Sequence, residues 1–194
     1  MVRIIAGAAR GRPLRAPAGE GTRPTADRVK EALFSSLQPR LPGARVLDLY
    51  AGSGALGLEA LSRGAGSLTA VESHPAALAA LRHNIDVVGL PGVEVVAGDV
   101  RRALRDDLPG APFDLVLLDP PYRTPDDELT EVLAALVGQL APGATVVVER
   151  SARAGEVAWP ADLLAEGSRR YGDTAVHRAR AGDEEPIGDG EEST

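Results

Sequence analysis

Short apolar runs alternate along the chain with segments of helical periodicity. From residue 45 onward, apolar runs of strand length stand at 46–50, 68–72, 93–97, 115–119 and 145–149. Each of the first four runs is followed by a segment typical of a helix, as over 75–88 and 127–140. Strands this apolar, each separated by a helix, favour a parallel sheet covered on both faces. The pattern therefore predicts an α/β fold.

The two ends of the chain depart from this alternation. An apolar run at residues 2–5 precedes a turn, and residues 24–38 predict a helix with one apolar face. Residues 163–180 predict a closing antiparallel hairpin around Gly172-Asp173. The glycine-, proline- and acid-rich end predicts disorder. We therefore divide the chain into a basic extension, a main domain and an acidic tail, at residues 1–40, 41–181 and 182–194.

Charge is concentrated at these two ends. The chain has a net charge of −7, yet residues 1–40 hold eight basic and three acidic side chains, and residues 183–194 hold six acids and no base. A basic extension on an acidic body is typical of a segment that binds a polyanion. Arg-rich segments can equally stay solvated, so charge alone leaves both interpretations open.

Composition narrows the chemistry. The chain has no cysteine, which excludes disulfides, thiolate metal sites and a cysteine nucleophile. Its three histidines are too scattered to predict a metal centre. No apolar run approaches the roughly 18 residues of a membrane span, and residues 1–5 do not resemble a signal peptide. We expect a cytoplasmic protein with no metal and no membrane partner.

A glycine-rich loop follows the first apolar run of the main domain. Residues 48–57 read DLYAGSGALG and hold the pattern Gly-x-Gly-x-x-Gly at Gly52, Gly54 and Gly57. Glu72 lies 20 residues after Gly52, where an acid ending the second strand bonds ribose hydroxyls. The pattern indicates a nucleoside cofactor, either NAD or S-adenosylmethionine, although a tight turn without a ligand needs similar glycines.

Acidic side chains stand at the expected ends of four strands. Asp48 favours S-adenosylmethionine, because a carboxylate there would repel a pyrophosphate and can pair with an ammonium group. Asp99 can accept a hydrogen bond from an adenine amino group, or cap the following helix, or do both. Since parallel strands end at one edge, we expect a single crevice lined by Asp48, Glu72, Asp99 and Asp119.

The fourth of these acids opens the motif Asp119-Pro120-Pro121-Tyr122. An aromatic amino nitrogen is a poor nucleophile, because its lone pair is delocalised into the ring. The Asp119 carboxylate and the Pro120 carbonyl can accept hydrogen bonds from the two N–H groups of this amine, and the two prolines hold that carbonyl rigidly. Tyr122 offers a face for a flipped-out base. The motif predicts methyl transfer to an exocyclic amine by direct displacement, without a covalent enzyme intermediate or a metal.

Three stretches together resemble the RsmD-type 16S ribosomal RNA guanine-N2 methyltransferases. They are RIIAGAARGRPL…TRPTADRVKEALFSSL between residues 3 and 37, DLYAGSGALGLEALSRGA at 48–65, and DPPY at 119–122. TRPTADRVKE is the most family-specific part. The resemblance implies a class I S-adenosylmethionine-dependent methyltransferase, with a Rossmann-like, mostly parallel seven-stranded sheet, helices on both faces and a short N-terminal β-hairpin and helix.

The resemblance also implies a substrate and a set of site residues. The substrate would be the N2 of one guanine in the head of the small ribosomal subunit, near the P site, on an assembled or assembling 30S particle. S-adenosyl-L-homocysteine would be the product, and we expect a monomer. The catalytic candidates are Asp119, Pro120 and Tyr122. The cofactor-binding candidates are Asp48, Tyr50, Gly52, Ser53, Gly54, Gly57, Glu72, Asp99 and Asp119. The RNA-binding candidates are Arg10, Arg12, Arg23 and Arg28.

Other functions remain open at this point. Methylation of a DNA adenine or a protein glutamine uses a similar proline-proline-aromatic loop, but neither accounts for the short basic extension. An NAD-dependent oxidoreductase disagrees with Asp48 and with the DPPY loop. A non-catalytic RNA-binding assembly factor could keep the same fold.

Overall fold

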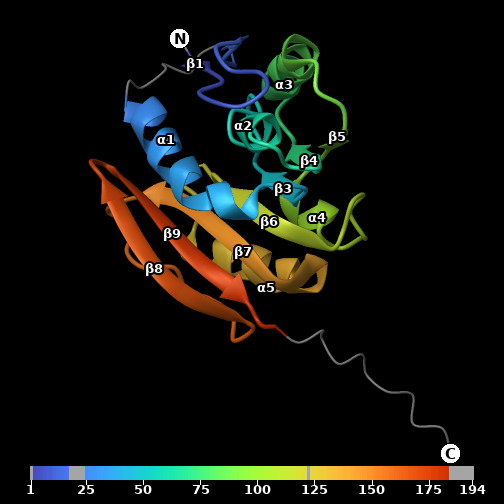
Figure 1. Ribbon diagram of the computed structural model, residues 1–194. Coiled ribbons are helices and arrows are strands. Elements are labelled where there is room, and N and C mark those ends of the chain that lie inside the picture. The colour runs from blue at the N-terminus through green and yellow to red at the C-terminus, as the bar shows by residue number, and fades with distance from the viewer. Residues whose placement is uncertain (1, 18–24, 122, 184–194) are drawn as a thin grey trace, which may run out of the picture.

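A seven-stranded sheet forms the centre of the molecule (Figure 1). The computed structural model describes residues 2–17, 25–121 and 123–183. Across the sheet, the strands follow the order β5-β4-β3-β6-β7-β9-β8. In that order they are Val93–Ala97, Ser67–Glu72, Arg45–Leu49, Phe113–Leu118, Leu140–Ser151, Thr174–Ala181 and Leu163–Tyr171.

The first five strands of this order are parallel, and β9 and β8 are antiparallel to their neighbours. The chain runs outward from β3 to β5 on one side, and then returns to place β6 on the other side of β3. This reversal is a topological switch point, and ligands of open α/β sheets bind outside the carboxyl ends of the strands there. The predicted class I fold is confirmed.

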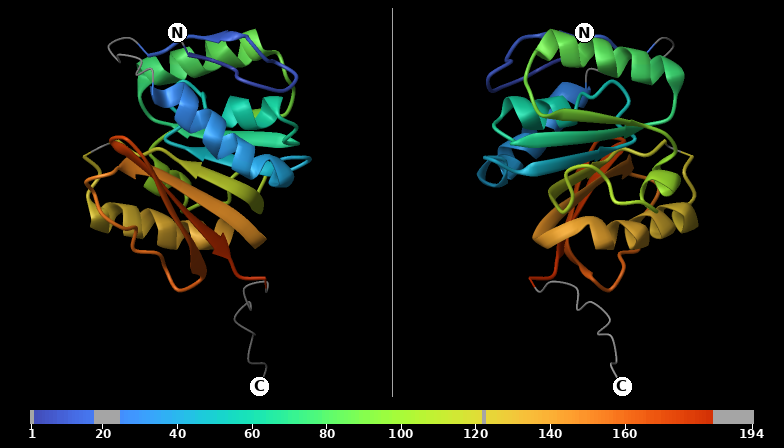
Figure 2. Two further views of the ribbon diagram at one scale, coloured as in Figure 1. Left: turned by 60° about the vertical axis from the view of Figure 1, so that its left-hand side comes forward. Right: turned by 90° about the vertical axis from the view of Figure 1, so that its right-hand side faces the viewer.

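Helices cover both faces of the sheet (Figure 2). The helical segments are α1 (Thr25–Leu37), η1 (Gln38–Arg40), α2 (Gly57–Ser62), α3 (Pro75–Val88), α4 (Val100–Ala103), α5 (Asp126–Leu136) and η2 (Val137–Gln139). Alternate strand residues point to opposite faces. Val46 therefore packs in the core beneath α1 to α3, and Leu47 packs in the core beneath α4 and α5.

The N-terminal extension is a small hairpin against the main domain. Its strands β1 (Val2–Arg3) and β2 (Pro13–Leu14) pair antiparallel and are only two residues long. Ile4 is completely buried, and Leu14 is nearly so. The extension is therefore part of the same hydrophobic core as α1, α2 and α3, rather than a separate unit.

The observed elements differ from the predicted ones mainly at their ends. The strand expected over 115–119 ends at Leu118, so Asp119 belongs to the following loop. The helix expected over 101–108 is the short α4. The hairpin expected over 163–180 is present as β8 and β9. The acidic tail beyond residue 183 lies outside the described residues. Within the described ranges, no helix is long and apolar enough to cross a membrane.

Candidate active site

Asp48 lies beneath the glycine loop at the end of β3. Its carboxylate is only 1% exposed, and its Oδ2 accepts a hydrogen bond of 2.9 Å from the backbone N–H of Gly57. Burial raises the pKa of Asp48 to about 7, and the nearby charge of Glu72 adds to this effect. A carboxylate that is hard to ionise here gains by receiving a cation. Its pairing with a ligand ammonium stays a prediction.

The three glycines of the loop have different roles. A Cβ on Gly54 would lie 2.5 Å from Leu81, and one on Gly57 would lie 2.8 Å from the Asp48 carboxylate. These two glycines are therefore required by packing within the protein. Gly52 has a φ of +57° and open space around its α-carbon, with only the Tyr50 carbonyl oxygen, at 3.9 Å, within 4 Å of a Cβ. Of the three, Gly52 is the one that leaves room for a ligand.

Glu72 ties the loop after β3 to the loop after β4. Its Oε2 accepts the N–H of Gly52 at 2.7 Å, and its Oε1 accepts the N–H groups of Ser73 and His74, both at 2.7 Å. Three backbone donors fix the carboxylate at the sheet edge. The Oε2 atom, which accepts a single N–H group, has a second lone pair for a hydroxyl donor, so the geometry is compatible with the predicted ribose contact, which stays untested.

Tyr50 is the most strained residue of the loop. Its φ of +61° lies in the left-handed region that non-glycine residues seldom occupy. Its hydroxyl is buried and has no hydrogen-bond partner, and burial raises its pKa to about 12. Glu128 and Asp99 raise this pKa further, which places both carboxylates in the same electrostatic neighbourhood. Strain and an unsatisfied hydroxyl are features that cluster at binding sites.

Asp99 caps the helix that follows β5. Its carboxylate accepts the N–H of Arg102 at 3.1 Å, as a helix N-cap does, and its side chain is exposed. The capping interpretation of the sequence is therefore confirmed. The predicted adenine contact is not excluded by it, because the second carboxylate oxygen is not used by the cap.

The loop after β6 begins beside the loop after β3. The N–H of Asp119 approaches the carbonyl of Leu49 at 3.4 Å, which places both loops at the switch point. The Asp119 side chain is exposed, whereas Pro120 is buried, and the Pro121 carbonyl accepts the N–H of Thr124 at 2.8 Å. Tyr122 lies outside the described residues. Asp119 thus begins the loop after β6 with its side chain exposed.

A buried arginine supports this turn. Arg150 lies near the end of β7, is only 9% exposed, and pairs with Asp126 at the start of α5. Together with Pro120 and Pro121 it lines a small pocket beside the motif. The sequence analysis did not single out Arg150, since one basic residue at the end of an apolar strand carries no distinctive signal.

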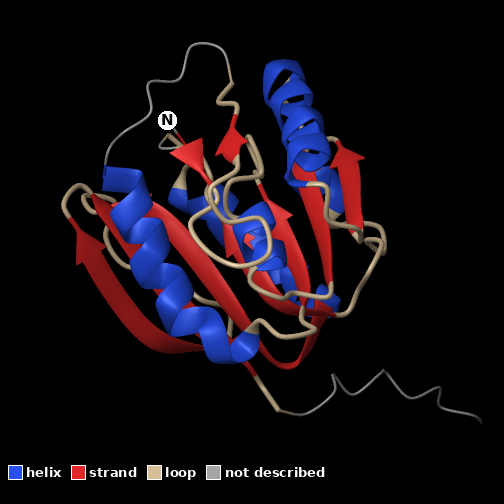
Figure 3. Cartoon of the chain, turned by 45° about the horizontal axis from the view of Figure 1, so that its top comes forward, coloured by secondary structure: helices blue, strands red, loops and turns tan. Residues whose placement is uncertain are grey.

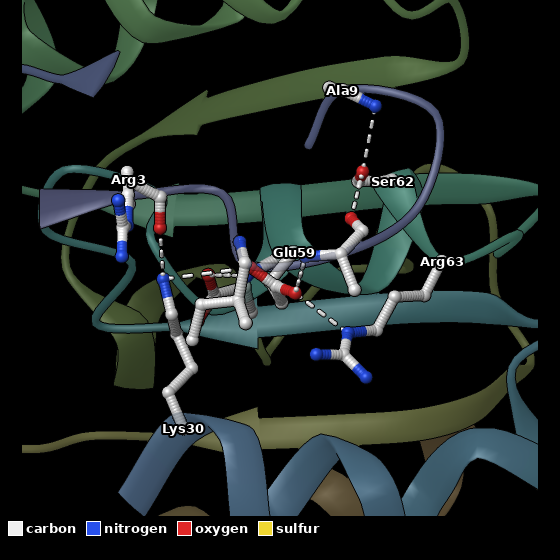
Figure 4. A network of polar contacts seen from close by, with 10 residues as sticks. Arg3, Ala9, Lys30, Glu59, Ser62 and Arg63 are labelled. Carbon is white, nitrogen blue, oxygen red and sulfur yellow. Dashed lines mark hydrogen bonds and ion pairs between the residues drawn. The ribbon is translucent and has the colours of Figure 1, made fainter. Parts of the chain in front are cut away.

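The N-terminal extension is attached to α2 through one buried carboxylate (Figure 4). Glu59 is completely buried and accepts the N–H groups of Ile5 at 2.7 Å and Ala6 at 3.1 Å. Arg63 donates to it at 2.6 Å, and the Lys30 ammonium lies at 3.6 Å. The single lysine of the chain therefore serves this junction.

A second set of contacts completes the junction. The hydroxyl of Ser62 donates to the Ala6 carbonyl at 2.6 Å and accepts the Ala9 N–H at 3.0 Å. At Gly7, a Cβ would lie 1.7 Å from the Ser62 carbonyl oxygen, so only glycine allows the backbones to approach this closely. Asn84 accepts the N–H of Arg15 and donates to the carbonyls of Arg15 and Ser53. The extension is thereby linked to the glycine loop.

The predicted RNA-binding arginines differ in what they contact. Arg12 donates to the carbonyls of Val87 and Val88 at 2.5 and 2.6 Å, and thus satisfies the C-terminus of α3. Arg10 and Arg28 are exposed. Arg23 lies outside the described residues. Arg10 and Arg28 are therefore better placed than Arg12 to contact a phosphate.

No group of three or more His, Asp or Glu side chains in the described ranges is arranged to hold a metal ion. Two residues of the junction, Glu59 and Asn84, were missed by the sequence analysis. Their backbone partners in the N-terminal hairpin segment, Ile5, Ala6 and Arg15, lie more than 50 positions away along the chain, so no local spacing indicates these contacts.

Comparison with known proteins gives matches along most of the chain. The family described as conserved hypothetical protein 95 matches residues 2–180. Ribosomal RNA small subunit methyltransferase D of Escherichia coli K12 is 40% identical over 161 residues, covering 83% of this chain and 80% of that protein. The putative rRNA methyltransferase YlbH of Bacillus subtilis 168 is 34% identical over 180 residues, covering 90% and 96%. The solved structure of the putative methyltransferase yhhF from Escherichia coli superimposes with a TM-score of 0.83 at 34% identity, covering 94% and 99%.

Proposed function

Because the chain belongs to the RsmD (conserved hypothetical protein 95) family, we propose that it transfers a methyl group from S-adenosylmethionine to the exocyclic N2 of a guanine in 16S ribosomal RNA. The observation that carries the proposal is the meeting of two loops at the switch point. The Glu72-bound glycine loop and the Asp119 turn lie side by side, joined by the approach of Asp119 to Leu49.

The loop after β3 fits a nucleoside cofactor with a positively charged amino-acid moiety. Gly52 leaves space for close approach, the hydroxyl of Tyr50 has no partner, and the carboxylate of Asp48 is buried with one backbone donor. Glu72 would hold the ribose hydroxyls, and Asp99 the adenine amino group. When bound, S-adenosylmethionine would supply a methyl group on a sulfonium, which a nucleophile in line with the S–C bond can attack, with the neutral thioether as the leaving group.

The residues after β6 would prepare that nucleophile. The Asp119 carboxylate accepts one N–H of the guanine amino group and the Pro120 carbonyl accepts the other, so the nitrogen lone pair points at the methyl group. The new N–C bond forms as the S–C bond breaks, and the nitrogen then loses one proton to solvent. Tyr122 would stack on the extruded base. Arg150 positions the turn from beneath, through the pocket it shares with Pro120 and Pro121.

The basic N-terminal extension supports RNA as the substrate. Arg10 and Arg28 are exposed on it, and the Escherichia coli relative is named a ribosomal RNA small subunit methyltransferase. We propose that a monomer acts in the cytoplasm on the assembled or assembling 30S particle, with Arg10, Arg12, Arg23 and Arg28 as the candidate phosphate contacts.

Transfer of radiolabelled methyl groups tests this proposal. The wild-type chain would be incubated with labelled S-adenosylmethionine and 30S particles from cells that lack the gene, in parallel with double-stranded DNA and total ribosomal protein. Label in the RNA fraction is the expected result. Label in DNA adenine or in protein would identify a different amino-group methyltransferase. RNA binding without label in any fraction would indicate a non-catalytic assembly factor.

A further inference from the structure

A half-open groove lies between α1 and the β8–β9 hairpin, away from both the glycine loop and the N-terminal hairpin. Figure 3 shows α1 crossing the sheet next to these two strands. The groove encloses about 520 Å³, with Leu33 and Ser36 on one wall and Glu166, Arg169 and Arg178 on the other. Nothing in the proposed methyl-transfer step uses it.

The groove is positively charged. Arg169 and Arg178 line it, and the only lining carboxylate among the described residues, Glu166, is 3.6 Å from the guanidinium of Arg40. Three guanidiniums and one carboxylate leave a local charge of +2. Burial lowers the pKa of the Arg178 guanidinium; Glu166 raises it, and the neighbouring guanidiniums of Arg40 and Arg169 lower it. An anion in the groove would relieve this repulsion.

Hydrogen bonds to hydroxyl groups hold two of these guanidiniums in place. Arg178 is only partly exposed, and its Nη2 donates to the Ser36 hydroxyl at 2.7 Å. Arg40 donates to the hydroxyl of Thr145 at 2.7 Å. A guanidinium fixed by a neutral partner keeps its charge available, and it loses less side-chain entropy on binding a phosphate.

The groove points toward the edge of the sheet that carries the proposed catalytic turn. In the strand register, Arg169 pairs with Val176, which pairs with Glu149 of β7, one residue beyond the level at which β6 ends. Three strand spacings of about 4.8 Å separate β8 from β6, so Arg169 lies roughly 14 Å sideways from the start of the Asp119 turn. One continuous strand of RNA can reach both places.

We propose that the groove between α1 and β8–β9 binds the phosphate backbone of the substrate RNA, with Arg169 and Arg178 as its principal contacts. This inference rests on the proposed function, and it adds a second RNA surface to the N-terminal arginines. Phosphate backbone is favoured over an acidic protein segment, because two guanidiniums line the groove and guanidiniums bind phosphates in a bidentate manner.

Salt-dependent binding of protein-free 16S ribosomal RNA tests the proposal. The double substitution Arg169→Gln with Arg178→Gln should flatten the slope of log affinity against log salt by about one to two units, at roughly 0.7–0.9 per phosphate contact. If the two proteins bind equally when extrapolated to about 1 M salt, the variant should bind about 10- to 100-fold more weakly than the wild-type chain at about 0.1 M salt. Substitution of two exposed arginines outside the groove, Arg82→Gln with Arg105→Gln, removes the same charge and should leave the slope unchanged.

A variant that should strengthen RNA binding separates a role of the groove in binding from a role in folding. Glu166→Gln removes the carboxylate from the groove and frees Arg40, so it should strengthen RNA binding, whereas loss of a purely structural ion pair would weaken or not change it. If the double variant has a lower melting temperature, Arg169→Gln alone is used. The Arg169 side chain is exposed, and its replacement by Gln should lower the slope by about 0.7–0.9 units.

The possible outcomes distinguish this proposal from the proposed function. If the wild-type chain methylates RNA but the groove variants keep its salt slope, the groove proposal is overturned and the proposed function stands. If the variants bind protein-free RNA normally and 30S particles weakly, the groove contacts a ribosomal protein, which also overturns it. If the wild-type chain neither binds nor methylates RNA, both proposals fail.

Discussion

Two buried carboxylates on either side of the glycine loop have opposite environments. Glu59, on the α2 side that holds the N-terminal extension, is surrounded by two backbone donors, Arg63 and Lys30. Asp48, at the end of β3, is buried just as deeply but accepts a backbone hydrogen bond from Gly57, and burial raises its pKa to about 7.

The difference separates a structural junction from a binding region. A buried charge is costly unless it is paired and hydrogen-bonded. The junction meets this requirement within the protein and has no need of a ligand. The region around Asp48 does not meet it, and the hydroxyl of Tyr50, which also follows β3, is unsatisfied too. Incompletely satisfied buried groups close together are expected where a ligand completes the arrangement.

The largest expected effect is on stability at the junction. Glu59→Gln leaves Lys30 and Arg63 as buried cations without a carboxylate, which should cost about 3–5 kcal/mol of unfolding free energy. Glu94→Gln, an exposed acid on β5, is the matched control and should change little. Denaturant unfolding of both variants checks this. Wild-type stability of Glu59→Gln would contradict a structural role for the network.

The next effect is on catalysis at the other loop. Asp119→Ala removes an acceptor used in the transition state, which should lower the turnover number by about two to three decades, or roughly 3 kcal/mol. Its melting temperature should stay close to that of the wild-type chain, because the side chain is exposed. Asp107→Ala, also exposed, serves as control in single-turnover methylation assays. Near-normal turnover of Asp119→Ala would mean that the turn does not hold the substrate.

Asp48 should give the cofactor-free chain a distinctive pH dependence. Its pKa in the folded chain is about 7 and its ordinary value is 3.8. Its contribution to stability is therefore fully present below about pH 4 and is lost as the pH rises through 7, with a slope of at most about 1.4 kcal/mol per pH unit. Unfolding of the wild-type chain and of Asp48→Asn between pH 5 and pH 8 isolates this contribution.

Cofactor binding should lower the raised pKa of Asp48. An ammonium near Asp48 stabilises the carboxylate, so binding at pH 6.5 should release protons, detected as a buffer-dependent enthalpy in calorimetry. Asp48→Asn should lose that buffer dependence. An identical release by the variant would assign the proton to another group.

The smallest effects compare two arginines of the extension. Arg10→Ala should weaken RNA binding and flatten its salt slope by about one unit, without changing the melting temperature. Arg12→Ala removes two hydrogen bonds to the end of α3 and should cost about 1–3 kcal/mol of stability. A melt and a salt titration on each variant check both. The reverse assignment of the two effects would overturn this distinction.

Much of the architecture could be predicted from the sequence, because the signals are local. The alternation of apolar runs and helices indicated the parallel strands, and Gly172-Asp173 indicated the final hairpin. Predictions of element ends were less accurate, because hydrogen bonding across the sheet decides them. β7 extends to Ser151 because β9 pairs with it from Thr145 to Ser151.

The candidate site was predicted in outline rather than in mechanism. The glycine pattern identified the loop, but it did not show that Gly54 and Gly57 are required by Leu81 and Asp48, and that Gly52 leaves room for a ligand. The charge count identified a basic extension, but not that Arg12 satisfies a helix end. These roles depend on contacts between distant residues, which a single sequence does not record.

Nucleoside analysis of the methylated RNA tests whether the chain methylates the N2 of a guanine in 16S ribosomal RNA. After reaction of wild-type chain with unmethylated 30S particles, the 16S ribosomal RNA would be digested to nucleosides and analysed by mass spectrometry, with the Asp119→Ala variant as control. We expect N2-methylguanosine from the wild-type chain, near one equivalent per particle, and almost none from the variant. A methylated adenosine, a guanosine methylated at a ring nitrogen, or equal product from the variant would contradict it.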